Sequence, residues 1–490
     1  MTDAPVAKIR PFVSHYTMGR GVDVGCGSDK IWPASIGIDR ARVNGKKIAD
    51  VESDAADLSM FADESLFYVF SSHLLQDAAD WEACLAEWWR VLKVEGYLVL
   101  WLSPDGPGPK DIGRAIRAVA PGGAMLVEDE RRGDGHFQVY QKRADGAFLA
   151  DPWEKPAKNC LVIRYGGFGD MIWASSLFPV LKSEGWHVTV NTTPAKMKVL
   201  EHDPHIDDFW LQESDQVPNA MLGDYWTGMA TRYDRVINLS ESVENILLAK
   251  PTQVLGRIPA ASRRAMFGDQ NYVEWTHKWA GVPGPFNPRF YATESELEWA
   301  REFRAGLRGK VVLWALTGSA AHKIYPRVAE VIAQLQRRGE YTVILSGAEN
   351  DREFETAIVD VVGRYSDASC LVPACGKWSI RETFAMAQVA DAVVGPETGV
   401  LNAVGMEDNL KVVFLSHSSV ANLTRDWVNT VSLSCEPPDH MLHYGWETLR
   451  KDPETGAASS ALIPAHEVVD AIVDGLRERP VMVEVLDAAE

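Results

Sequence analysis

Two glycine-rich turns follow apolar, strand-like runs, and each carries side chains that could bind a nucleotide-type ligand. The first lies in VDVGCGSDK (residues 22–30) and the second in LVIRYGGFGDMIWASS (residues 161–176). Glycines let the backbone come close to a phosphate or a nucleoside, and a following helix supplies unpaired N–H groups and the positive end of its dipole. The pattern predicts two strand-to-helix turns, two nucleotide-type ligands and two activities.

An acid follows the first turn at the end of the next apolar run. Asp23, Gly25 and Gly27 lie in the turn itself, and Asp39 ends the run IGI. An acid at the end of a second strand can accept both ribose hydroxyls, while the glycine turn admits the nucleoside close to the backbone. We therefore expect the first turn to hold a nucleoside-type cofactor.

The second turn ends in an acid, Asp170, at the mouth of an expected helix. A carboxylate there can take a proton from a sugar hydroxyl that attacks an anomeric carbon, and the glycines leave space for that acceptor. The alternative is that Asp170 only caps the helix, as aspartate often does. Capping does not require a loop with three glycines, so we favour a general base.

Partners for such a base follow far downstream, each after a strand-like run. Backbone N–H groups and one ammonium in LTGSAAHKIYP could hold a diphosphate, and the turn in AVVGPETGVLNAVG suits an anionic or sugar ligand. LSGAENDRE places an acid where it could bind a ribose diol or a base edge. The residues concerned are Gly318, Ser319, Lys323, Glu349, Glu397, Thr398 and Gly399.

Three successive α/β series must position these residues. The first contains the expected strands VDVG, SIGID, LFYVFSS and YLVLWLS, followed by an antiparallel hairpin over residues 124–143. The second contains CLVIRYGG, HVTVNTT and RVINLS, and the third contains five runs from GKVVLWALTG to KVVFLSH. We expect one domain at residues 1–145, a linker at 146–158, and two Rossmann-like halves that face a cleft, at 159–305 and 306–490.

The motif order over residues 20–143 resembles the class I S-adenosylmethionine-dependent methyltransferases, specifically those with a DxGCG turn and a terminal RVLKPGG-like segment. The matching runs are VDVGCG, Asp57-Leu58, FADESLFYVFSSHLLQD and EWWRVLKVEGYLVLWLS. The resemblance implies an S-adenosylmethionine site with its methionine and ribose cradle at Gly25 and Gly27. The other residues implied to bind the cofactor are Asp23, Asp39 for the ribose, Asp57 and Leu58 for the adenine edge, and His73.

The second half resembles glycosyltransferase family 9, the ADP-heptose:lipopolysaccharide heptosyltransferases, which have the GT-B fold. The motifs GGFGD, HDPHIDDFW, GSxxxKxYP, SGAE and PETG occur in family order over residues 159–435. The resemblance implies that Asp170 is the catalytic base, that Lys323 is the main cation on the leaving diphosphate, and that Glu349 contacts the nucleoside. It also places phosphate contacts at Thr398 and Gly399.

Two departures from that family concern the donor sugar. Glu397 stands where the family has an aspartate, and Asn402 stands where it has a histidine. The resemblance therefore implies inverting, metal-independent transfer from a nucleotide-diphosphate sugar to a glycan-type acceptor, without specifying heptose.

Composition narrows the classes of partner. A formal charge of −19 and a pI near 5.1 argue against a broad nucleic-acid footprint, so nucleic acid is disfavoured as a partner, although a local basic groove stays open. The N-terminus has no signal-peptide core, and no apolar run approaches about 18 residues. We expect a cytoplasmic protein without a membrane span, which leaves peripheral membrane association open.

No metal site is expected from the spacing of potential ligands. Asp207-Asp208 is interpreted as an acidic turn, and the group of His440, His443 and Tyr444 lacks a third ligand nearby. The six cysteines form no CxxC pair and are expected to be reduced.

We therefore expect an enzyme with two activities, glycosyl transfer and methyl transfer. Two alternatives stay open. In one, the methyltransferase-like domain is a non-catalytic binding module; in the other, the chain glycosylates and methylates modified bases of nucleic acid. The sequence leaves open the donor sugar and its nucleotide base, the acceptor, the methylated atom and the oligomeric state.

Overall fold

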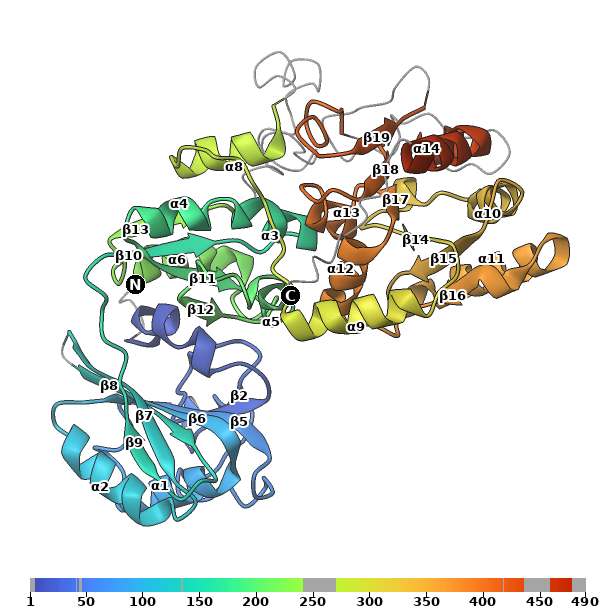
Figure 1. Cartoon of the computed structure of the whole chain (residues 1–490). Helices are drawn as coiled ribbons and strands as arrows, with labels where there is room; N and C mark the ends of the chain where they lie inside the picture. Colours follow the sequence, from blue (N-terminus) through green and yellow to red (C-terminus); the bar gives the residue numbers. More distant parts are fainter. Residues whose placement is uncertain are drawn as a thin grey trace, which may run out of the picture. The chain divides into compact units, whose positions relative to one another are not determined.

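The computed structural model describes residues 5–40, 42–43, 46–133, 135–240, 270–416, 418–435 and 459–477. The chain divides into two compact units (Figure 1). The first combines residues 1–161, 191–194 and 209–236, and the second combines residues 162–190, 195–208 and 237–490. The first unit therefore includes segments that lie well beyond the expected first domain in sequence.

A seven-stranded sheet forms the centre of the first unit, in the order β2-β1-β5-β6-β8-β7-β9. Its strands are β1 (Gly21–Val24), β2 (Ile36–Ile38), β5 (Leu66–Ser72), β6 (Leu92–Leu102), β7 (Ala124–Arg132), β8 (Gly135–Lys142) and β9 (Phe148–Ala150). The neighbouring strands β2, β1, β5 and β6 are parallel to one another, and β7 and β8 form the predicted antiparallel hairpin. The edge strand β9 falls within the range expected to be a linker. A separate two-stranded pair, β3 (Arg42–Val43) and β4 (Lys46–Lys47), follows β2.

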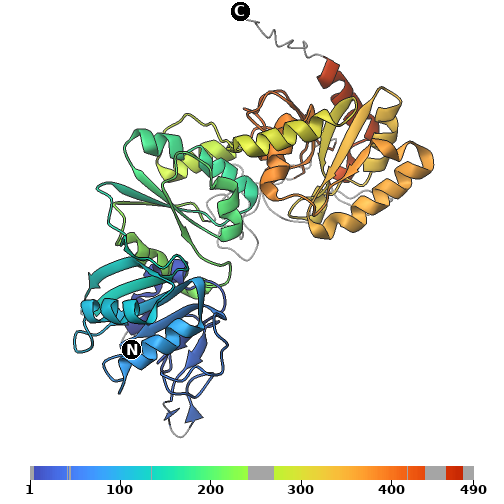
Figure 2. The same ribbon diagram turned by 60° about the horizontal axis from the view of Figure 1, so that its bottom comes forward.

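Two helices cover one face of this sheet. Helices α1 (Trp81–Val91) and α2 (Pro109–Val119) lie side by side (Figures 1 and 2). Alternate residues of β6, namely Leu98, Leu100 and Leu102, join their apolar side chains in one buried core. Successive side chains of a strand point to opposite faces of the sheet, so every second residue of β6 faces these helices.

The opposite face is covered by short helical turns near the N-terminus. These are η1 (Pro5–Lys8), η2 (Arg10–Phe12) and η3 (Ser14–Tyr16). The Tyr16 ring packs against Tyr97 of β6, with ring centroids 5.2 Å apart, and its hydroxyl donates to Glu128 of β7 at 2.9 Å. Arg232, from the distant segment 209–236, pairs with the same carboxylate at 3.0 Å.

The first glycine turn does not lead into a helix, so the predicted strand-to-helix turn is wrong there. Residues 25–35 run from β1 to β2 without a helical turn. The buried Asp23 carboxylate accepts the Ile31 N–H at 2.6 Å, and the Arg10 guanidinium donates to the carbonyls of Lys30 and Ile31 at 2.8 and 2.9 Å. These bonds use backbone groups that a helix would need, so this turn has no helix dipole behind it.

Four strands form a second sheet in the order β12-β11-β10-β13. They are β10 (Asn159–Ile163), β11 (His187–Thr192), β12 (Asp208–Leu211) and β13 (Arg235–Asn238). Along them lie α3 (Phe168–Ser175), α4 (Phe178–Ser183), α5 (Pro194–Leu200), η4 (Asn219–Met221) and α6 (Leu222–Ala230). Here the glycine turn does lead into a helix, α3, as predicted. Strand β12 was not predicted.

A six-stranded parallel sheet forms the centre of the second unit. Its strands are β14 (Lys310–Ala315), β15 (Tyr341–Ser346), β16 (Leu371–Pro373), β17 (Ala392–Pro396), β18 (Leu410–Phe414) and β19 (Thr430–Leu433). The order β16-β15-β14-β17-β18-β19 is the Rossmann order 3-2-1-4-5-6, which reverses between β14 and β17. Strand β19 was not predicted.

Helices cover both faces of this sheet. They are α8 (Tyr272–Ala280), α9 (Glu294–Ala305), α10 (Val328–Gln336), α11 (Arg352–Tyr365), α12 (Ile380–Val389), α13 (Gly399–Ala403) and α14 (Ala465–Arg477), with short turns η6 (Ala321–Lys323), η7 (Glu349–Asp351), η8 (Ala368–Cys370) and η10 (Ser459–Leu462). Val312 and Trp314 of β14 join one buried core, and Val311 and Leu313 join the other. A strand buried on both faces explains the continuous apolar run VVLWA.

The predicted α/β class with Rossmann-like sheets is confirmed by this topology. Among the described helices, none is long and apolar enough to cross a membrane.

Candidate functional site

A cavity of about 550 Å³ opens in the second unit, where the strand order reverses. Its walls include the residues that follow β14, β15 and β17, together with α3 and α12. Ligands of open α/β sheets bind at such reversal points, outside the carboxyl ends of the strands. The volume lies in the range of about 300–1,000 Å³ that is usual for ligand pockets.

Asp170 lines this cavity from the first turn of α3. Its carboxylate accepts the backbone N–H of Gly167 and forms an ion pair with Arg164, with 2.7 Å between nitrogen and oxygen. The Arg164 side chain is only 4% exposed and also donates to the Leu239 carbonyl at 2.6 Å. Asp170 thus caps the helix and lines the cavity at once, so capping and catalysis need not be alternatives.

The glycines of the second turn let α3 approach α13. A Cβ atom on Gly399 would lie 2.7 Å from the Phe168 Cβ and 3.2 Å from the Gly169 nitrogen. A Cβ atom on Gly169 would lie 3.0 Å from Asn402 Nδ2. Asn402 in turn accepts the Trp173 Nε1–H at 2.6 Å, so it joins the two helices. The glycine loop therefore serves close packing as well as ligand access.

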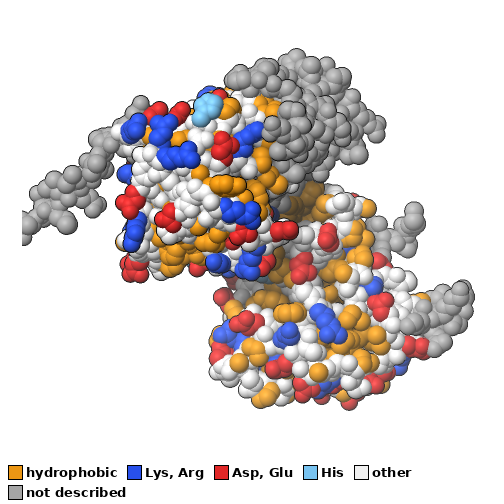
Figure 3. Space-filling view, turned by 90° about the vertical axis from the view of Figure 1, so that its right-hand side faces the viewer, with side chains coloured by type: hydrophobic (Ala, Val, Ile, Leu, Met, Phe, Trp, Pro, Cys, Tyr) orange, Lys and Arg blue, Asp and Glu red, His pale blue; other side chains and the backbone are white. Residues whose placement is uncertain are grey.

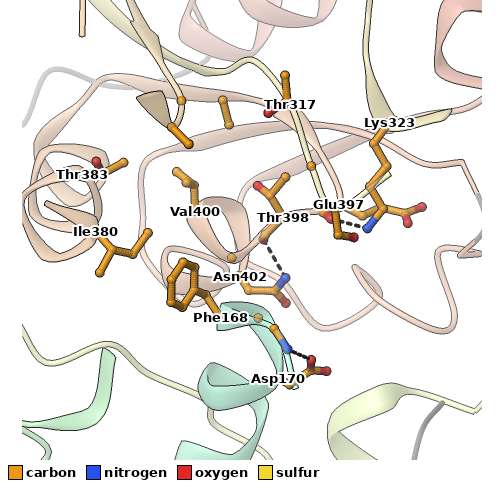
Figure 4. A pocket seen from close by; sticks show the side chains of 18 of the residues that line it. Phe168, Asp170, Thr317, Lys323, Ile380, Thr383, Glu397, Thr398, Val400 and Asn402 are labelled. Atoms are coloured by element: carbon orange, nitrogen blue, oxygen red, sulfur yellow. Dashed lines mark hydrogen bonds between the residues drawn. The ribbon is translucent and has the colours of Figure 1, made fainter. Parts of the chain in front are cut away.

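Lys323 and Glu397 also line the cavity, from the segments that follow β14 and β17 (Figure 4). The Lys323 ammonium donates to the Glu397 backbone carbonyl at 2.9 Å, and burial lowers its pKa, although the charges of Glu397 and Asp170 oppose that shift. The Glu397 carboxylate accepts the backbone N–H groups of Ser416 and Ser418 at 2.7 and 3.1 Å. Glu397 thus anchors a loop, and Lys323 supplies positive charge at the cavity wall.

The other predicted donor-site residues divide into two groups. Gly318, Ser319, Thr398 and Gly399 line the cavity. The Thr398 hydroxyl is buried without a hydrogen bond to any described residue. Glu349 is not among the lining residues, because its side chain is 67% exposed and pairs with Arg352 at 2.7 Å.

Several lining residues were not predicted from the sequence. Lys196 of α5 lies near Asp170, and Trp378, Ile380 and Thr383 line the wall at and before α12. In Figure 4, Ile380 and Thr383 lie across the cavity from Lys323. Arg164 could have been noticed as a lone cation in an otherwise apolar strand beside the glycine loop; the others carry no local signal.

The first glycine turn is built on two glycines with left-handed backbone conformations. Gly25 and Gly27 have positive φ angles of 77° and 54°, and the Gly27 N–H donates to the Asp39 carboxylate at 2.9 Å. Space above Gly27 is open, whereas a Cβ atom on Gly25 would lie 2.9 Å from the Leu74 side chain. The glycine cradle and the ribose-binding acid fit the nucleoside part of the cofactor, but Leu74 narrows the space at Gly25.

The remaining predicted cofactor residues are more dispersed. Asp23 is 1% exposed, and burial raises its pKa to about 7. Leu58 is fully buried in the core, whereas Asp57 is exposed and accepts the Ser59 N–H at 3.1 Å. His73, at the end of β5, has a φ of 52° and contacts the Ser72 hydroxyl at 3.0 Å through Nδ1. Asp23 thus holds the loop, and Leu58 belongs to the buried core.

No cluster of His, Cys, Asp and Glu that could hold a metal occurs among the described residues. Asp207 pairs with Lys182 at 2.7 Å, and Asp208 contacts His187 Nε2 at 2.6 Å at the start of β12. The group around His440 and His443 lies outside the described residues.

Two family models match the sequence. A model described as a methyltransferase domain matches residues 22–100, and a model described as glycosyltransferase family 9 (heptosyltransferase) matches residues 270–402. The first match contains the glycine turn of β1, and the second contains Lys323 and the Glu397–Gly399 turn. No curated protein matches the sequence.

Similar solved structures belong to the same two groups. A family 9 glycosyl transferase from Veillonella parvula is 16% identical, with a TM-score of 0.49 over 67% of this chain and 100% of the other. ADP-heptose LPS heptosyltransferase II of E. coli is 17% identical, with a TM-score of 0.47 over 65% and 98%. A SAM-dependent methyltransferase from Thermotoga maritima is 17% identical, with a TM-score of 0.22 over 28% and 92%.

Proposed function

Because the chain is an enzyme that joins a methyltransferase domain to a domain of glycosyltransferase family 9, we propose that it transfers a sugar from a nucleotide-diphosphate donor to a glycan hydroxyl and also transfers a methyl group. One observation carries the first activity. The Asp170 carboxylate and the Lys323 ammonium line one cavity at the reversal point of the sheet. They could serve the two ends of a glycosyl transfer, the attacking hydroxyl and the leaving diphosphate.

Asp170 acts as the general base in this proposal. Its carboxylate takes the proton of the acceptor hydroxyl, whose oxygen attacks the anomeric carbon from the side opposite the diphosphate, and the configuration inverts. The ion pair with Arg164 fixes the position of the carboxylate. A carboxylate has about four lone-pair sites, so these contacts leave room for a substrate hydroxyl.

Lys323 stabilises the leaving group. As the sugar–oxygen bond breaks, negative charge accumulates on the diphosphate, and a buried ammonium acts on it more strongly than an ammonium in water would. A lysine in this place supplies the positive charge that a metal ion supplies in other transferases, which supports metal-independent transfer. The Thr398 hydroxyl is available to donate to the same diphosphate.

The second activity belongs to the first domain. S-adenosylmethionine, when bound, supplies an activated methyl group, and Gly25, Gly27 and Asp39 are the residues that would hold it. The second candidate, a non-catalytic module, is favoured by one observation, namely that no helix follows the glycine turn in residues 25–35. Calorimetric titration of the full chain with S-adenosylmethionine separates the two. Saturable binding that Asp39→Ala weakens at least about tenfold supports cofactor use, and no binding supports the module.

The third candidate, modification of nucleic acid, has no support on the surface that Figure 3 shows. Lys and Arg side chains are interspersed there with Asp, Glu and apolar side chains, and they do not gather into one basic field. Together with the net charge of −19, this supports a glycan acceptor over nucleic acid.

The variant Asp170→Asn separates catalysis from capping. Asparagine caps a helix as well as aspartate but cannot take a proton, so a base predicts a loss of about 10²–10⁴-fold in transfer from ADP-heptose to a lipopolysaccharide core oligosaccharide. ADP binding, measured by calorimetry, should be unchanged in Asp170→Asn and weakened in Lys323→Met. Full turnover in Asp170→Asn would refute the assignment of the base. If the wild-type protein turns over neither ADP-heptose nor other nucleotide sugars, the proposed activity is wrong.

A further inference from the structure

Lys196 is a cation in the cavity wall that the proposed reaction does not use. It belongs to α5 and lines the cavity beside α3, the helix that carries Asp170. Its neighbour Lys198 is 56% exposed and pairs with Glu201 at 2.8 Å. The two lysines of this short helix therefore differ, because Lys198 lies at the surface and Lys196 lines the cavity.

The Lys196 ammonium has no hydrogen bond or ion pair with any residue that the structure describes. It lies over the face of the Phe168 ring, 4.1 Å from its centroid. Partial burial lowers its pKa, and the charge of Asp170 opposes the shift without a direct contact. The half-buried ammonium has lost part of its hydration, and the contact that it gains in return is the face of the Phe168 ring. Its N–H donors could therefore bind an anionic ligand.

The position of Lys196 favours the acceptor over the donor. In the proposed reaction, Lys323 serves the diphosphate from the loop after β14. Lys196 belongs instead to α5 and lies over the ring of Phe168, two residues before Asp170 in α3. Asp170 carries the carboxylate that would take the proton of the acceptor hydroxyl. An ammonium beside the base is placed to hold another group of the same acceptor molecule.

We propose that Lys196 binds a carboxylate or phosphate on the acceptor sugar, so that the enzyme selects acidic over neutral acceptors. This inference rests on the proposed glycosyltransferase function. The Phe168 ring contacts the ammonium, and the acidic group adds charge-assisted hydrogen bonds, which are stronger than neutral ones. Lys196 is a specificity-determining residue in this scheme and takes no proton.

The test uses the full-length protein saturated with ADP and three probes: glucuronate, glucose 6-phosphate and glucose. Binding is followed by ligand-detected NMR. We expect the wild-type protein to bind at least one acidic sugar about tenfold more tightly than glucose, and the stronger of the two distinguishes a carboxylate from a phosphate. Lys196→Met should reduce that preference to the level of glucose, and Lys198→Met should leave it intact.

Separate measurements of ADP affinity keep the two proposals distinguishable. Lys196→Met should bind ADP like the wild-type protein. An acid preference that survives in Lys196→Met, or no preference in the wild-type protein, would overturn the inference. A loss of ADP affinity in Lys196→Met as large as that in Lys323→Met would assign Lys196 to the donor and overturn it too. Failure of the wild-type protein to bind ADP would count against the proposed function itself.

Discussion

Aspartate side chains that are shielded from water have different surroundings in the two units. In the second unit, the Asp170 carboxylate pairs with Arg164, and the cations Lys196 and Lys323 lie within electrostatic reach of it. In the first unit, Asp23 is buried and accepts a hydrogen bond from the backbone N–H of Ile31. Burial is the larger effect on its pKa, which rises to about 7. The Asp23 carboxyl group is therefore favoured in its neutral form in the folded protein.

Asp23→Asn tests that difference through the pH dependence of stability. A raised pKa means that the folded state binds the proton more tightly, so the wild-type protein loses stability as the pH rises from about 4 to about 7. The loss is about 1.4 kcal/mol per pH unit in that interval. In urea unfolding, the free energy of unfolding of the variant should rise relative to that of the wild-type protein between pH 5 and pH 7. Above pH 7 the difference should change little. A constant difference across this range would contradict the assignment.

Helix α3 reaches its position because glycines permit contact with α13. Phe168 and Gly169 meet Gly399 almost backbone to backbone, and the pair Trp173–Asn402 joins the same two helices. The base Asp170 and the donor-side turn at Thr398 are thereby held at fixed separation. Asn402, which replaces the histidine expected from family resemblance, acts here as a link between helices.

Gly399→Ala should therefore destabilise the second unit. The new Cβ atom would meet Phe168 at 2.7 Å, and such overpacking costs about 1–3 kcal/mol. Transfer activity should fall as well, because α3 must shift. The matched control is Gly223→Ala in α6, where the new Cβ atom would meet nothing within 4 Å. This substitution should leave the free energy of unfolding unchanged or raise it by up to about 1 kcal/mol. Urea unfolding measures both; equal stability of the two variants would argue against the contact.

The first unit is not limited to the expected methyltransferase domain. The sheet face that lacks helices is covered by η2 and η3, and these contact segment 209–236. The Trp210 indole and the Tyr225 hydroxyl both contact the Ser14 hydroxyl, at 2.9 and 2.8 Å. Trp153, from the expected linker, lies 4.0 Å from the Arg232 guanidinium. Because residues 209–236 supply part of the cover of this sheet, we expect them to contribute to the stability of the first unit.

Breaking the buried pair Glu128–Arg232 tests this contribution. The two side chains are 1% and 5% exposed, so Arg232→Met would leave a buried carboxylate without its cation, at a cost of about 3–5 kcal/mol. Adding Glu128→Gln to Arg232→Met should recover part of that loss. Arg114→Met, which breaks an exposed pair with Asp111, should change the free energy of unfolding by less than about 1 kcal/mol. Similar losses in the two single arginine variants would show that segment 209–236 contributes little to the first unit.

The sequence by itself determined the α/β series and the two glycine turns, because strand and turn patterns are local. It also indicated that Lys323 and Thr398 would meet, since residues after parallel strands of one sheet gather at one edge. The resemblance to glycosyltransferase family 9 implied that Asp170 acts on the same substrates. Tertiary structure decided the rest. It removed the helix expected after Gly27, placed Glu349 outside the cavity, and brought Lys196 beside Asp170. These outcomes depend on packing between segments far apart in the chain, and no periodicity within one segment encodes such packing.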